Sequence, residues 1–208
     1  MSGRQTGMAE PVQDACQWLL RRDPGPMPAS EAAACVAAAA TAGGGARQQL
    51  DSRTSLLPTG VYTVDFTTSG GFSLRLAADD GNLEVRVDEE RRELVVDGAP
   101  VPASSGGSPE EAYADVLVTA AETTTSPDRL AAFLDTAEEI SVQYDDETQG
   151  IPAVRLSARL PADGAAAPAR NAVLWLDDFY RPVRIELSGA QQGIDFGLTA
   201  VNTGWRLP

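Results

Sequence analysis

The sequence of 208 residues contains no histidine and no lysine, and all sixteen of its basic residues are arginines. Without histidine there is no imidazole to act as a general base or metal ligand, and without lysine there is no amine to form a Schiff base. Catalytic arrangements of the Ser-His-Asp and Cys-His types are therefore excluded. We expect a protein that is not an enzyme and that holds no metal or other cofactor.

Positive charge is scarce as well. The chain carries 30 acidic residues against its 16 arginines, which gives a formal net charge of −14 at pH 7. Nucleic-acid phosphates and anionic lipid headgroups repel a protein of this charge, so we expect no nucleic-acid partner. The charge favours solubility. The use of arginine alone, with much alanine and glycine, is typical of a GC-rich genome such as an actinobacterial one.

Long apolar runs are absent too, since no stretch approaches the ~20 apolar residues that span a membrane. The start, MSGRQTGMAEPVQDAC, has no apolar core of a signal peptide, and Gln-Asp-Ala before Cys16 does not form a lipoprotein cleavage site. If the natural precursor is exported, its signal segment is absent from this chain. We expect a disordered tail over residues 1–10 and a single domain over residues 11–208.

The chain has only two cysteines. Cys16 and Cys35 lie in the helix-like runs VQDACQWLLRR and SEAAACVAAAATA, which the rigid stretch DPGPMPA joins. We expect a disulfide between them, closing a loop of about 20 residues and stabilising the fold by ~3 kcal/mol. The alternative is two separate buried thiols. A disulfide would indicate an oxidising compartment outside the cytoplasm.

Helical patterns occur in two places. Two helices are expected over residues 11–22 and 30–42, the second ending at Gly43-Gly44-Gly45. Two more are expected over residues 109–123 and 127–139, each opened by a Ser-Pro pair that supplies a cap and a first-turn proline. In the third helix, Tyr113, Val116, Leu117 and Ala120 form one apolar stripe.

The rest of the chain alternates apolar and polar residues with the period of two that is typical of strands. Tyr62, Val64 and Phe66 share one face, and turn residues separate the runs. About ten strands result, which predicts an α+β fold: a curled antiparallel sheet, or half-barrel, with helices packed on its concave face. In the hairpin NAVLWLDDFYRPVRIELSG, four consecutive apolar residues leave the inward face of residues 171–177 open.

Two acidic turns offer candidate sites. The cluster at residues 145–147 offers the oxygen ligands that calcium prefers but lacks the spacing of a calcium loop. Asp177 and Asp178 could form a carboxylate pair for acid-base chemistry. Charged, solvated turns between strands explain both better, and we expect no metal site.

The order of elements resembles the LppX/LprG-type lipoprotein family, which consists of LolA-like half-barrel lipid carriers, over about residues 30–205. The most specific segments are DRLAAFLDTAEEISVQYDDETQGIPAVRLSARL and VLWLDDFYRPVRIELSG, the latter with a Trp-hydrophobic-Asp pattern, a turn and Arg-Pro-Val. The sequence departs from the family at Phe179-Tyr180, where relatives commonly place a glycine. It also shows no lipid-anchoring cysteine, and its Cys16/Cys35 hairpin is additional.

The resemblance implies an apolar cavity between sheet and helices, which binds acyl lipids or lipoglycans for carriage or presentation, without catalysis. We accordingly expect an extracytoplasmic monomer of the cell envelope or a periplasm-like space. The alternative is a cell-envelope protein-interaction module of the same fold, with a filled core and no ligand. The apolar residues expected to line the cavity are Val64, Phe66, Leu74, Val85, Leu117, Leu130, Phe133, Leu134, Leu156, Leu174, Ile185 and Phe196.

Overall fold

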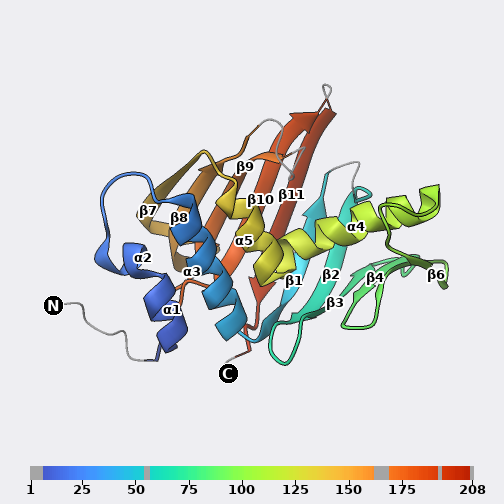
Figure 1. The fold of residues 1–208 in the computed structure, drawn as a ribbon, viewed down its shortest axis with the longest axis horizontal. Helices are drawn as coiled ribbons and strands as arrows, with labels where there is room; N and C mark the ends of the chain where they lie inside the picture. Colours follow the sequence, from blue (N-terminus) through green and yellow to red (C-terminus); the bar gives the residue numbers. More distant parts are fainter. Residues whose placement is uncertain (1–6, 54–56, 162–168, 192–193, 207–208) are drawn as a thin grey trace.

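The computed structural model describes residues 7–53, 57–161, 169–191 and 194–206. Within these residues the chain forms five helices and one open sheet of eleven strands (Figure 1). In chain order the elements are α1 (Glu10–Ala15), α2 (Gln17–Arg21), α3 (Ala29–Ala42), β1 (Gly45–Ser52), β2 (Gly60–Thr67), β3 (Ser73–Ala78), β4 (Leu83–Val87), β5 (Arg92–Val96), β6 (Ala99–Pro102), α4 (Pro109–Thr125), α5 (Pro127–Asp135), β7 (Glu139–Thr148), β8 (Ile151–Arg159), β9 (Ala169–Leu176), β10 (Pro182–Gln191) and β11 (Ile194–Thr203).

The sheet consists of two meanders that are joined by the first and last strands. Its order is β6-β5-β4-β3-β2-β1-β11-β10-β9-β8-β7, and every neighbouring pair is antiparallel. Twist accumulates over so many strands, so the sheet curls and acquires a concave side. The helices lie on one face of this sheet, α4 across one meander and α3 and α5 over the other (Figure 1). The predicted α+β half-barrel is confirmed.

Both edges of the sheet are protected against further pairing. At one edge, β6 contains Pro100 and Pro102, which have no N–H to offer to another strand. At the other edge, the Met27 N–H donates to the Ile140 carbonyl at 2.8 Å, so the segment before α3 covers part of β7. Unpaired edge strands promote aggregation, and the prolines of β6 and the hydrogen bond to β7 reduce that tendency.

Several predicted boundaries are wrong. The helix expected over residues 11–22 is broken at Cys16, whose φ of −100° and ψ of 24° separate α1 from α2. The helix expected to reach residue 139 ends at Asp135, because β7 starts at Glu139. Of the predicted tail of residues 1–10, the structure describes residues 7–10, where Met8 is buried and α1 begins at Glu10.

The hairpin of β5 and β6 was only half predicted. Asp97 and Gly98 have φ values of 49° and 82°, and this left-handed pair reverses the chain into β6, a strand that was not expected. The inward face of β9 is now defined. Leu174 and Leu176 are buried on the helix-covered side, whereas Val173 and Trp175 are only partly buried on the other face.

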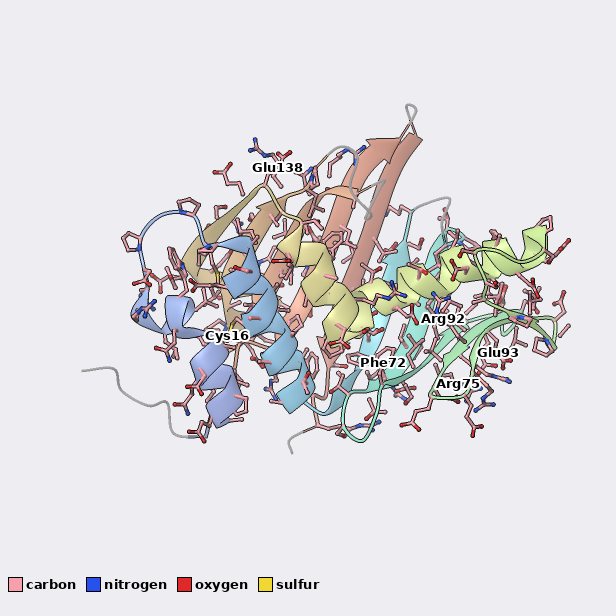
Figure 2. The ribbon with its side chains drawn as sticks, in the orientation of Figure 1. Cys16, Phe72, Arg75, Arg92, Glu93 and Glu138 are labelled. Carbon is pink, nitrogen blue, oxygen red and sulfur yellow. A yellow bond between two sulfur atoms is a disulfide. The ribbon has the colours of Figure 1, made fainter. Side chains whose placement is uncertain are left out.

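The predicted disulfide between Cys16 and Cys35 is confirmed. It links the junction of α1 and α2 to the middle of α3, and both cysteines are fully buried (Figure 2). None of the helices in the described residues is long and apolar enough to cross a membrane.

Reduction of the disulfide should lower the free energy of unfolding by ~3 kcal/mol, because the unfolded chain regains the freedom of a loop closed across a separation of 19 residues. Urea unfolding with and without a reductant measures this difference. The C16A/C35A variant is the control and should not respond to the reductant. Equal unfolding midpoints for the oxidised and reduced wild type would contradict the expectation.

Candidate functional site

The candidate site is the apolar concave face of the sheet together with the helix side chains that cover it, here called the trough. Eleven of the twelve predicted lining residues have described side chains, and each is at most 6% exposed. All eleven belong to one continuous hydrophobic cluster. Phe196 lies opposite Gly189 in the pairing of β10 with β11, and its side chain is outside the described residues.

The strand register brings the sheet residues of the trough together. Phe66 lies opposite Leu74, and Leu156 lies opposite Leu174, so these pairs project from neighbouring strands on the same face. The helices supply the opposing layer. From the sheet come Val64, Phe66, Leu74, Val85, Leu156, Leu174 and Ile185; from α4 and α5 come Leu117, Leu130, Phe133 and Leu134.

In this conformation, α4 and α5 insert their apolar residues into the trough. The near-complete burial of the lining residues means that helix side chains fill the space over the sheet. An empty cavity of ~500 Å³ would cost about 12 kcal/mol, as much as the whole stability of a typical domain. A ligand-free protein of this fold is therefore expected to be closed in this way.

A charged cluster fastens α4 to the sheet. Arg92 on β5 donates to Glu122 at 3.0 and 3.1 Å, to Thr119 at 2.7 Å and to Asp115 (Figure 2). The Glu122 side chain is only 7% exposed, and Arg129 approaches it to 3.6 Å. Desolvation lowers the pKa of Arg92, but its hydrogen bonds to Glu122 and Asp115 outweigh this effect and raise the pKa overall.

A second polar contact fixes the junction of α4 and α5 over the centre of the sheet. Gln48 on β1 donates to Asn202 at 2.9 Å and accepts from the Thr124 hydroxyl at 3.0 Å. Asn202 in turn donates to the Pro182 carbonyl at 2.8 Å. Gln48, Thr124 and Asn202 are all buried, so each of these hydrogen bonds avoids a substantial desolvation penalty.

Trp205 packs against the trough residue Phe66. Its ring meets Phe66 edge-on, with centroids 5.7 Å apart and an interplanar angle of 87°. A Cβ at Gly43 would lie 2.5 Å from the same ring, so the indole can occupy this place only beside a glycine. The sequence analysis did not recognise the roles of Arg92 and Gln48.

The predicted turn at residues 177–181 has the expected structural role. The Asp177 carboxylate accepts hydrogen bonds from the backbone N–H groups of Phe179 and Arg181 and pairs with the Arg181 guanidinium at 2.7 Å. Where relatives were expected to have glycine, Tyr180 adopts a φ of 60°. Within the described residues, no group of three or more potential ligands could hold a metal ion.

Two solved structures share this architecture. LprF from Mycobacterium bovis matches with a TM-score of 0.53 and 17% identity, over 89% of this chain and 96% of that one. The Mycobacterium tuberculosis lipoprotein LppX matches with a TM-score of 0.55 and 17% identity, over 87% of this chain and 97% of that one. The fold is that of LppX and LprF. No family model and no curated protein matches the sequence. At this identity the likeness to LppX concerns the fold alone.

The polar clamp on α4 should be measurable. Replacing Arg92 by Met leaves the buried Glu122 carboxylate without its main partner, and we expect a loss of ~2 kcal/mol in the free energy of unfolding. In the Arg92→Met variant, the backbone amides of α4 should exchange hydrogen faster than those of α3. The matched control is Arg75→Met, because Arg75 is exposed and pairs with Glu84, so it should cost under about 1 kcal/mol. Equal losses in the two variants would refute the role of the clamp.

Proposed function

We propose that this protein binds lipids or lipoconjugates through their acyl chains, and carries or presents them in the trough between sheet and helices. The observation that carries the proposal is the extended apolar concave face, covered by helices that polar contacts hold in place. A structural neighbour of the same fold is a lipoprotein, LppX. The absence of histidine and lysine supports a role in binding rather than catalysis.

The energetics favour exchange of helix side chains for acyl chains. A sixteen-carbon chain gains ~12 kcal/mol of gross burial at ~0.8 kcal/mol per methylene. When the helices move away from the sheet, their apolar side chains lose burial of the same kind. The burial gained by the acyl chain is therefore nearly balanced by the burial that the helices lose. Such a balance suits a carrier, which has to release its ligand as well as hold it.

We infer that α4 is the element that moves. Its buried face is shallow, with Ala114, Leu117, Val118 and Ala121, so it has less apolar contact to lose than a leucine-rich helix would. By contrast, α3 packs closely on α5 and is cross-linked through Cys35. The extended Ser126, which separates α4 from α5, offers a hinge for this motion.

The proposed location is outside the cytoplasm, in the cell envelope or a periplasm-like space. Disulfides persist in oxidising compartments, and the bond between Cys16 and Cys35 supports such a location. We propose a monomer whose ligand is an acyl lipid or a lipoglycan.

A second candidate is a protein-interaction module whose core is permanently filled. Two observations favour it: the closed trough, and an apolar stripe on α4 that was expected to face the core. Tyr113 and Val116 of that predicted stripe are 49% and 40% exposed, whereas Leu117 is buried. The stripe prediction was therefore wrong for these two residues, which leave an apolar surface that a cell-envelope protein could cover.

Native mass spectrometry of the purified protein, followed by titration of delipidated protein with a fluorescent fatty acid and a neutral monoacylglycerol, separates the two candidates. We expect co-purifying acyl species or stoichiometric binding of both probes. A clean protein that binds neither probe would leave only the interaction module.

The clamp variant adds a kinetic test. If α4 has to open for entry, Arg92→Met should accelerate uptake of the neutral monoacylglycerol several-fold, because the barrier includes breaking the contacts of Arg92. Stopped-flow fluorescence measures the rate, and Arg75→Met should leave it unchanged. Equal uptake rates in the wild type and the Arg92 variant would contradict opening through α4.

A further inference from the structure

A cavity of about 490 Å³ lies at the end of the sheet where the β7–β8 and β9–β10 turns meet α2. We call it the end pocket; Leu19, Tyr144, Val154, Leu176 and Tyr180 are among the residues that line it. These residues come from α2, from the irregular part of β7, from β8, from the end of β9 and from the β9–β10 turn. In Figure 1 the elements α2, β7 and β8 lie together at the left of the molecule.

The wall of the end pocket adjoins the trough on the same face of the sheet. Val154 and Leu176 of its wall are cross-strand partners, and the next inward-facing pair along the same strands is Leu156 and Leu174, which belong to the trough. Two residues along a strand correspond to about 7 Å, the length of a few methylene groups. A headgroup in the end pocket would therefore have its acyl chain directed along the trough.

One phenol hydroxyl in this pocket has no hydrogen-bond partner. Tyr144 Oη is buried and unpaired, and the Tyr180 side chain, which lines the same pocket, is 7% exposed. Unsatisfied buried polar atoms are rare in folded proteins, and one that lines a cavity points to a polar group of a ligand as its partner.

The charge of the end pocket selects against anions. Four aspartates line it, namely Asp145, Asp146, Asp177 and Asp178, against the single arginine Arg22. Arg155 and Arg181, which lie outside the lining, neutralise Asp146 and Asp177. Asp178 has no ion pair among the residues that the structure describes. The net charge of −14 on the whole chain adds a potential that attracts cations.

The pocket already holds a cation from its own chain. The Arg22 guanidinium lies 5.2 Å from the centroid of the Tyr144 ring and 3.6 Å from the Asp145 carboxylate. Because both charged side chains are mostly exposed, this pair contributes little stability and can exchange. Arg22 therefore marks where a ligand cation can sit.

We propose that the end pocket binds the primary ammonium headgroup of a cationic amphiphile whose acyl chain lies in the trough; this rests on the proposed lipid-binding function. The ammonium displaces Arg22 and donates its three N–H groups to the carboxylates and phenol oxygens. Burial raises the pKa of both phenols, so they remain neutral hydroxyls that accept these hydrogen bonds.

Isothermal titration with three chain-matched probes below their critical micelle concentrations tests the inference: tetradecylamine, monomyristoylglycerol and myristate. We expect the amine to bind at least about tenfold more tightly than the other two, the size of one or two charge-assisted hydrogen bonds. Butylamine should bind far more weakly than tetradecylamine. Equally tight binding of butylamine would show a site for free amines and overturn the assignment to amphiphiles.

Variants sharpen the test in both directions. The D145N/D178N variant should abolish the preference for the amine but keep the affinity for monomyristoylglycerol, whereas R22Q should raise the affinity for the amine several-fold. The matched control is D79N/E90Q, which changes the net charge equally at exposed turns away from the pocket. If D79N/E90Q weakens amine binding as much as D145N/D178N, general charge explains the preference and the inference fails.

The two proposals fail in different ways. If all three acyl probes bind the wild type with equal affinity, the lipid-binding function stands and the ammonium site is refuted. If none of the acyl probes binds, the lipid-binding function itself is refuted, and the headgroup assignment falls with it.

Discussion

One constraint governs this molecule: an open sheet of eleven strands has a large apolar concave face that has to be kept from water. Strands alone cannot cover it, because the sheet does not close and its ends, β6 and β7, lie far apart in the sheet order. Three helices provide the cover. The strength with which each helix is attached is therefore decisive. A helix that stays in place makes the apolar face a permanent core, whereas a helix that can move away opens the face to a ligand.

The attachments differ in kind between the two halves. Over β7 to β10, α3 and α5 pack on each other, and the disulfide joins α3 to the N-terminal helices, which favours a fixed wall. Over β3 to β6, α4 has a small apolar face and depends on Arg92 and Gln48 for its position. When a helix moves into water, the loss of its hydrogen bonds and ion pairs costs less free energy than the loss of apolar burial, because water replaces the polar partners. A polar attachment is thus suited to a reversible cover.

Much of this architecture could be predicted from local signals. The period of two in β2 placed Val64 and Phe66 on the buried face, and Ser126-Pro127 located the start of α5. The polar contacts could not be predicted, because their partners are distant in sequence: Gln48 and Asn202 are 154 residues apart. For the same reason, Asp145 and Asp178 were interpreted as two separate solvated turns, although folding brings both to the wall of one pocket.

The position of that pocket bears on how a ligand could be held during exchange. The end pocket lies in the β7–β10 half of the sheet, next to α2, which the disulfide ties to α3, whereas α4 covers the β3–β6 half. A headgroup bound there would stay anchored to the rigid half of the protein while α4 opens over the other half. The acyl chain would then enter or leave without loss of the whole complex. In this arrangement the end pocket would set the specificity for the headgroup, and α4 would set the rate at which the acyl chain is released.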